Sequence, residues 1–324
     1  MKTLTPLKCL AIATLSFALV ACGGGGGGGG GSSSGGVVVT PFTGFSYLQP
    51  NTTVFAPAGY STDVTYNSNI VNGYVTSKSA PTVSSGTAGS TSGVGATETL
   101  NGSTLATSLN INSAAGTNAT WSIAAGDSLT NVTYNSTTVA VYALNAARTN
   151  EALYVYGPGM GWSYQTYGIW ITGEGTGAGN AGAMSVGAIS PASGIPTTGT
   201  ATFTGTSGGV YVAASGQPYL TLSDITAATN FGTRSITFNT TNTIISAFNG
   251  SGASAQTGLN LSGTLAYSAG TNAFNGTVTT ANSAMTGTAR GVFYGPSATE
   301  LGGIYNVQAS SGLQSMSGAF GGKR

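Results

Sequence analysis

Alternating apolar and polar residues run through the chain after its first 36 residues, in short segments separated by Gly, Asn and Ser clusters. The clearest is Leu259–Tyr267, whose odd positions are apolar or glycine and whose even positions are polar or small. Ser268–Asn272 has the composition of a turn, and Ala273–Thr279 resumes the alternation. A period of two is typical of a half-buried strand, so these residues predict a β-hairpin.

The rest of the C-terminal third repeats this pattern at intervals typical of sandwiches and barrels. About eight to ten strands are expected there, enough to close a small eight-stranded antiparallel barrel with a filled interior. The further segments are Thr200–Thr206, Val210–Ala214, Tyr219–Leu222, Arg234–Asn239, Thr243–Phe248, Met285–Tyr294, Gly303–Gln308 and Met316–Gly321.

The preceding part of the chain is also β-like but less regular, and no stretch sustains a helical period. Ser190–Pro196 carries two prolines with Ser and Gly between them and is the expected boundary. We therefore predict an all-β protein with a first β domain over 37–190 and a barrel domain over 191–324. The strands expected in the first domain are Val38–Phe45, Asp63–Tyr66, Ala119–Ile123, Thr138–Leu144, Leu153–Tyr156 and Tyr164–Ile171.

Residues 1–21 have the pattern of a bacterial export signal. Lys2 and Lys8 form a positive start, and Cys9–Val20 is an apolar run too short to span a bilayer. The sequence Leu19–Cys22 has the pattern of a lipoprotein processing site, which predicts lipid attachment at Cys22. An ordinary secretory signal with a chance cysteine is the alternative.

Cys22 is followed by an unbroken glycine run and then by Ser and Gly up to Gly36. Such a stretch buries nothing, so residues 22–36 are expected to be a flexible tether with an r.m.s. span of about 20 Å. Gly23, rather than aspartate, after Cys22 is compatible with delivery to the outer membrane. The predicted membrane partner is therefore reached through a lipid anchor.

Charge and cysteine content exclude several function classes. Only 8 Lys/Arg and 7 Asp/Glu occur in 324 residues, there is no histidine, and both cysteines lie within the first 22 residues. A nucleic-acid partner would need a basic surface, and zinc or haem sites commonly need His or Cys. The acidic residues are scattered, with no pair closer than about 20 residues and no base to activate a nucleophile. We therefore expect no enzyme activity, no catalytic residues, no metal site and no cofactor.

Three motifs in the last 129 residues resemble one protein family. Gly291–Ile304 (GVFYGPSATELGGI) is similar to a signature of transferrin-binding protein B barrels. Gly318–Arg324 resembles the ending of those domains, and Pro196–Gly205 resembles their first strand. The signature occurs once, which implies a single-lobe relative in the group of surface lipoproteins that includes factor H-binding protein. The signature residues are Gly291, Phe293, Tyr294, Gly295, Pro296, Glu300, Leu301, Gly302, Gly303, Phe320, Gly321 and Lys323.

The resemblance implies an eight-stranded barrel preceded by a handle of small sheets, and export by an outer-membrane translocon. We expect structural roles for the signature. Gly295-Pro296 suits a tight turn, Gly302 and Gly303 suit close strand approach or a bulge, and Phe293 and Phe320 would fill the interior. Glu300 is expected to cap backbone N–H groups at that turn, with Arg290 as its ion partner.

A tyrosine- and tryptophan-rich run surrounds Gly157–Gly161 and offers the best candidate binding site. In one interpretation this loop presents Met160, Trp162 and Tyr164 to a partner, since aromatic residues dominate binding hot spots. In the other, Tyr164 or Tyr167 packs with Trp170 in the core of the first domain.

The leading hypothesis is an outer-membrane-anchored, surface-exposed binding lipoprotein that captures a host or nutrient-carrier ligand. The alternative is a structural or adhesive coat lipoprotein with no specific small ligand. Transferrin binding does not follow from the resemblance, because the low charge departs from lysine-rich binders of host proteins. The alternation of apolar and polar residues, together with the low content of charged residues, also allows a third interpretation, an integral outer-membrane barrel.

Overall fold

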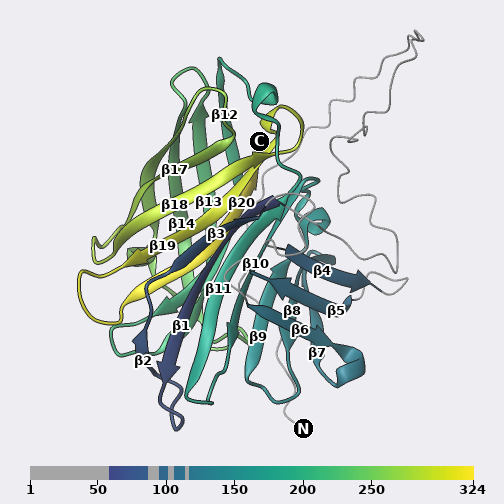
Figure 1. Cartoon of the computed structure of the whole chain (residues 1–324), viewed down its shortest axis with the longest axis vertical. Helices are drawn as coiled ribbons and strands as arrows, with labels where there is room; N and C mark the ends of the chain where they lie inside the picture. Colours follow the sequence, from purple (N-terminus) through teal and green to yellow (C-terminus); the bar gives the residue numbers. More distant parts are fainter. Residues whose placement is uncertain (1–57, 87–94, 101–105, 114–116) are drawn as a thin grey trace.

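The computed structural model describes residues 58–86, 95–100, 106–113 and 117–324, and these are almost entirely β-structure (Figure 1). The predicted signal, Cys22, the tether and the expected strand Val38–Phe45 lie outside the described residues. No helix in the described ranges has the length and apolarity needed to cross a membrane.

The C-terminal part of the chain is a closed antiparallel barrel, which confirms the predicted fold class. Eight strands follow one another around it, and the pairing of β13 (Pro218–Asn230) with β14 (Ser235–Ser246) closes the ring. Two-residue β15 (Ser254–Ala255) is appended to β14. The eight strands are β12 (Thr200–Val212), β13 (Pro218–Asn230), β14 (Ser235–Ser246), β16 (Leu261–Tyr267), β17 (Ala273–Thr280), β18 (Thr286–Tyr294), β19 (Glu300–Gln308) and β20 (Ser315–Lys323).

The predicted hairpin is present: β16 pairs with β17, with Tyr267 opposite Phe274. Elsewhere the strands are longer than the sequence suggested. The two segments predicted on either side of Gly208 form the single strand β12, and those around Thr240–Asn242 form the single strand β14. Polar and glycine residues stay within these strands because the ladder on both sides satisfies their backbone groups.

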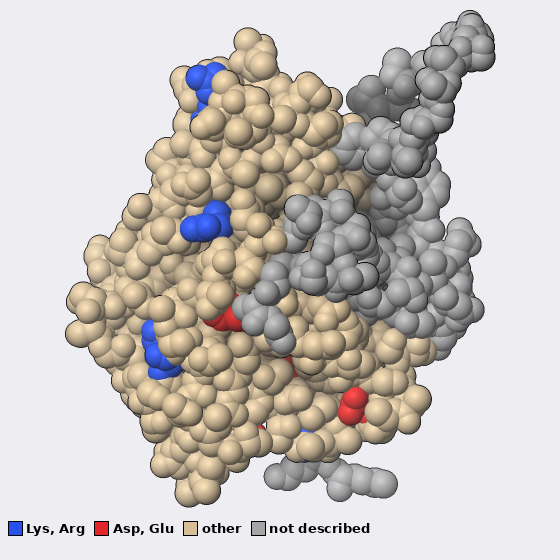
Figure 2. Space-filling view, in the orientation of Figure 1, with Lys and Arg blue, Asp and Glu red and all other residues tan. Residues whose placement is uncertain are grey.

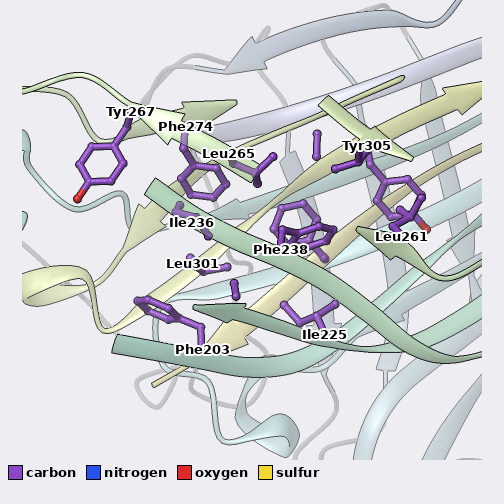
Figure 3. Packing of buried hydrophobic residues seen from close by; sticks show 14 of the residues in the cluster. Phe203, Ile225, Ile236, Phe238, Leu261, Leu265, Tyr267, Phe274, Leu301 and Tyr305 are labelled. Carbon is purple, nitrogen blue, oxygen red and sulfur yellow. The ribbon is translucent and has the colours of Figure 1, made fainter. Parts of the chain in front are cut away.

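The barrel interior is filled by aliphatic and aromatic side chains from all around the sheet (Figure 3). Phe293 is fully buried, and its ring centroid lies 5.3–6.1 Å from those of four other aromatic residues. Phe320 is also fully buried, with its ring 4.7 Å from that of Phe238. The contacts of Phe293 are with Phe203, Phe231, Tyr267 and Phe274.

Polar residues face outward on the barrel strands β16 and β17. On β16, Leu261 and Leu265 are buried while Ser262 and Thr264 are exposed, and β17 follows the same rule. A barrel that spans lipid shows the opposite pattern, with an apolar band facing outward. These strands therefore suit water, and the integral-barrel reading does not fit them.

The N-terminal part forms an eight-stranded antiparallel sheet that lies against the barrel (Figure 1). A separate three-stranded sheet consists of β4 (Gly95–Leu100), β5 (Ala106–Asn112) and β6 (Asn118–Ser122). The larger sheet comprises β1 (Ala58–Ser68), β2 (Val75–Lys78), β3 (Thr82–Gly86), β7 (Ser128–Tyr134), β8 (Thr137–Leu144), β9 (Asn150–Val155), β10 (Gln165–Thr172) and β11 (Ala178–Gly187).

The two faces of the larger sheet bury different side chains. Tyr167 and Ile169 pack with residues on the outer face of the barrel, while Trp170 packs with Trp121 and others under the small sheet. The order is therefore small sheet, large sheet, barrel. Tyr167 and Trp170 are both buried, as one interpretation of the sequence expected, but they lie on opposite faces of the sheet and so belong to two clusters instead of one core.

Candidate functional site

The loop predicted to bind a partner connects β9 to β10 and begins with a short 3₁₀ helix, Gly157–Met160. Trp162 follows it but is only 3 % exposed, and its ring centroid lies 6.0 Å from that of Tyr167. The expectation that this indole faces a partner is therefore wrong: it packs in the cluster shared by the sheet and the barrel. Met160 and Tyr164 are partly exposed.

Glu300, the first residue of β19, fastens this loop to the barrel. Its carboxylate accepts hydrogen bonds from the backbone N–H groups of Ser163, at 2.7 Å, and Tyr164, at 3.0 Å. Glu300 is fully buried, and burial raises its pKa while these donors oppose the rise. Glu300 thus caps backbone N–H groups, but those of the neighbouring sheet's loop rather than of its own turn.

The ion partner of Glu300 also differs from the prediction. Glu300 lies opposite Lys323 in the pairing of β19 with β20, and the charge of Lys323 favours the ionised carboxylate. Arg290 lies opposite Ile304, four positions further along β19, so it is about 13 Å along the strand from the position of Glu300. The Lys323 ammonium also donates to the carbonyl oxygen of Gly161, at 2.7 Å.

Two signature glycines lie where side chains of the N-terminal sheet touch the barrel. A Cβ at Gly302 would lie 2.3 Å from Oε1 of Gln165 and 2.6 Å from Oγ of Ser185. A Cβ at Gly321 would lie 2.9 Å from both Gln165 Oε1 and the Trp162 ring. Glycine is therefore required here for close approach of the two units. The β18–β19 and β19–β20 registers run without a shift, so no bulge occurs.

The signature thus divides into two groups. Phe293, Leu301 and Phe320 fill the barrel, Pro296 lies in the turn before β19, and Gly291 and Gly303 pack against interior rings. The other group contacts the N-terminal part of the chain or its β9–β10 loop and is called the Glu300 junction below; it consists of Tyr294, Gly295, Glu300, Gly302, Gly321 and Lys323.

A second feature lies on the β1–β2 loop, at the end of the molecule away from the C terminus (Figure 1). Ile70 is 69 % exposed and Val71 is 90 % exposed, and these two residues are called the β1–β2 tip. The third exposed large hydrophobic residue among the described residues, Ile123, is on a different loop. Ile70 and Val71 are adjacent in sequence, so together they form a small apolar surface at this end of the molecule.

A cavity of about 190 Å³ lies directly beside the β1–β2 tip. Asn72 and Tyr74 of the same loop line it, together with Tyr66 of β1 and Gln217 of the β12–β13 turn. Glu174, which follows β10, supplies its only charged side chain, so we call it the Glu174 cavity. Charge is sparse elsewhere too: Figure 2 shows a few isolated basic and acidic patches on an otherwise uncharged face.

Glu174 has another carboxyl group as its neighbour. It shares a side-chain hydrogen bond with Glu151 of β9, whose Oε2 also accepts a 2.7 Å hydrogen bond from the Tyr142 hydroxyl. Burial and the nearby Glu151 carboxylate raise the pKa of Glu174 to about 8. Near neutral pH Glu174 therefore keeps its proton, which its hydrogen bond shares with Glu151.

This pair is not evident along the sequence, because Glu151 and Glu174 come together only when β9 pairs with β10. Glu151 lies opposite Ile171 in the antiparallel β9–β10 pair, so Glu174, three residues later, falls at the same sheet end. The sequence signal for such a pair is an acidic residue at the start of one strand and a second acidic residue just after the end of the next, antiparallel strand. No cluster of three or more His, Cys, Asp or Glu suitable for a metal ion occurs among the described residues.

Comparison with known proteins matches one part of the chain to a family. Residues 195–324 match the family model described as the C-lobe and N-lobe beta barrels of Tf-binding protein B. The resemblance predicted from three motifs is thereby confirmed for the barrel. No curated protein sequence matches the chain.

The chain is also similar to several solved structures. A mutant of transferrin-binding protein B from Haemophilus parasuis has 11 % identity and a TM-score of 0.41, covering 85 % of this chain and 78 % of that one. A structure described as a surface lipoprotein has 14 % identity and a TM-score of 0.42, covering 82 % and 98 %. Transferrin-binding protein B of Neisseria meningitidis has 16 % identity and a TM-score of 0.38, covering 64 % and 38 %.

Proposed function

We propose that this chain is a binding lipoprotein anchored in the outer membrane through Cys22 and displayed on the cell surface, where it captures a host or nutrient-carrier protein. The observation that carries the proposal is the barrel itself. It matches the family model of transferrin-binding protein B barrels, and its interior is filled by its own side chains. A filled barrel offers a partner its outer surface, which suits a macromolecule.

Binding without catalysis fits the acidic groups that the structure describes. Glu300 is occupied by backbone donors, and Oδ1 of Asp63 accepts hydrogen bonds from Ser113 and Thr117. The Glu151–Glu174 pair has no cysteine or histidine to work with, since the mature chain would contain neither apart from the lipidated Cys22. We therefore assign the protein a binding role.

The anchor is tested in a Gram-negative host that produces the full-length chain. Wild-type protein should stay with the outer membrane and be accessible to protease and antibody on intact cells. Cys22→Ser should lose this retention, because the lipid supplies the membrane affinity. Cys22→Ser protein that stays in the membrane and resists carbonate and urea extraction would contradict the proposal.

The partner is tested on the same cells, first with iron-loaded transferrin and then with fractionated host serum. One saturable partner is expected, with serum albumin as the control. Absence of any saturable partner would instead favour a structural coat protein. The Ser-, Thr- and Asn-rich outer faces of β16 and β17 suit that role, because they are polar and uncharged.

A further inference from the structure

We propose that the β1–β2 tip and the Glu174 cavity together form the docking site for a partner protein, which inserts an arginine side chain into the cavity and receives Ile70 and Val71 in an apolar hollow beside it. The inference rests on the proposed binding function and names the site and the partner's chemistry. It departs from the β9–β10 loop that the sequence suggested, because the indole of that loop is buried.

The tip is held in a fixed conformation while its apolar side chains face water. The Asn69 side chain accepts a hydrogen bond from Val71 N–H at 2.8 Å, and the Asn72 side chain accepts one from Tyr74 N–H at 3.0 Å. Gly73 N–H closes the turn on the Asn69 carbonyl, at 2.8 Å. A preorganised loop loses little conformational freedom on binding, so its exposed side chains can contribute to affinity.

The barrel braces the same loop from behind. Val75 N–H donates to the Gly216 carbonyl at 2.8 Å, and the Tyr74 hydroxyl donates to Gln217 Oε1 at 3.0 Å. The cavity wall is therefore built from both the N-terminal sheet and the barrel, and it does not depend on one loop alone. This wall places the cavity and the apolar tip side by side.

The cavity lining suits a planar cation. Tyr66 and Tyr74 contribute aromatic side chains, a type that attracts cations, and Glu174 contributes a carboxyl group. Gln217 contributes an amide oxygen that accepts from a hydroxyl and can accept from a further donor. A guanidinium group has several donors in one plane and is weakly hydrated, which makes arginine the best match. A volume of about 190 Å³ accommodates that head group and part of its stem.

Charge complementarity comes from the Glu151–Glu174 pair. An arriving guanidinium takes the place of the shared proton, which leaves to solvent, and the pair then carries two negative charges against the bound cation. The other titratable groups facing this pair are Tyr142, which donates to Glu151, and Arg148, whose charge acts on Glu151 and Tyr142. Tyr66 lies across the cavity, and the neighbouring Lys78 is directed to Gln308 of the barrel.

The first experiment titrates the full-length protein with N-acetylarginine amide and follows binding by NMR, with N-acetylnorleucine amide as the neutral probe. Only the cation should bind, and its affinity should rise about tenfold from pH 7 to pH 9, because Glu174 must lose its proton. Glu174→Gln should abolish both the binding and its pH dependence. Asp224→Asn, which alters a partly exposed barrel carboxylate bonded to Asn242, is the matched control and should bind normally. Equal binding of both probes, or normal binding by Glu174→Gln, would overturn the cavity assignment.

The second experiment separates this inference from the proposed function. Cells that produce wild-type protein, Glu174→Gln or the double variant Ile70→Ser/Val71→Ser are compared for capture of the saturable partner. Loss of capture by at least tenfold in both variants is expected. Capture by wild type that neither variant alters would overturn the docking site while leaving the binding function intact. If neither the wild type nor the variants capture a partner, the proposed binding function is wrong, and the arginine titration still tests the cavity assignment.

Discussion

Two glutamates at opposite ends of the contact between sheet and barrel have opposite surroundings. Glu300 is fully buried, yet two backbone N–H groups and a lysine serve its carboxylate. Glu174 is only partly buried, yet its neighbour is another carboxyl group, and it faces a cavity. A buried carboxylate that accepts several hydrogen bonds stabilises the fold. A carboxyl group that is protonated because another carboxylate lies beside it can instead be stabilised in its ionised form by a bound cation.

The same contrast holds for the surfaces around them. The Glu300 junction has glycines in close contact with side chains of the N-terminal sheet, so no free volume remains there. The Glu174 end keeps a cavity and two exposed apolar side chains. We infer that the first end fixes the relative position of sheet and barrel, and that the second is available to a partner.

Glu300→Ala should have the largest effect of the substitutions considered. It leaves the N–H groups of Ser163 and Tyr164 without an acceptor in a buried site, and the free energy of unfolding should fall by about 3 kcal/mol. Urea denaturation measures it. Glu300→Gln keeps an acceptor oxygen and should cost clearly less. A loss below about 1 kcal/mol for the alanine variant would show that the junction does not stabilise the fold.

Gly302→Ala should destabilise the protein by about 2 kcal/mol, because its methyl group would overlap with Gln165 and Ser185. The matched control is Gly232→Ala, whose nearest atom would be the Asn230 side-chain oxygen, 3.4 Å away. The control should change stability by less than about 0.5 kcal/mol. Equal effects of the two substitutions on the thermal midpoint would argue against close contact at the Glu300 junction.

Glu174→Gln should stabilise the protein at high pH, by on the order of 1 kcal/mol after screening by solvent. The pKa of Glu174 is raised to about 8, so its contribution to stability is complete below about pH 4.5 and is lost as pH rises through 8. The wild type should therefore weaken between pH 6 and pH 9 more than the variant does. Parallel pH profiles of the two denaturation midpoints would contradict this sign.

Ile70→Ser/Val71→Ser should change stability least, by less than about 0.5 kcal/mol, because neither side chain is buried in the fold. The measurement is the thermal midpoint of the full-length protein. A large loss would mean that the tip is part of the protein's own packing, and it would no longer be a free surface.

The barrel could be predicted from sequence because some of its strands, such as β16 and β17, bury one face only, although β19 and β20 are buried on both faces. In β16 and β17 the apolar positions alternate cleanly with Ser, Thr and Asn. By contrast, the sequence does not predict β11, because its residues AGNAGAMSVG are small on both faces of the strand and show no alternation. It lies in the middle of a sheet that packs between two layers, where small residues replace the usual alternation.

The candidate site was harder to predict, because its parts come from distant segments. The aromatic composition of the β9–β10 loop predicted a binding surface, but Trp162 of this loop is buried. The Glu174 cavity joins the β1–β2 loop, the end of β10 and the β12–β13 turn, and no motif spans them. Local sequence shows which residues are reactive or apolar, while their exposure is decided by tertiary packing.

The contrast between the two glutamates is tested most directly by a ¹³C NMR titration of the side-chain carboxyl groups of the full-length protein, with and without N-acetylarginine amide. Glu174 should titrate near pH 8 alone, and its midpoint should move toward lower pH when the arginine analogue is present. A Glu174 midpoint near 4.5 that does not respond to the analogue would contradict the account.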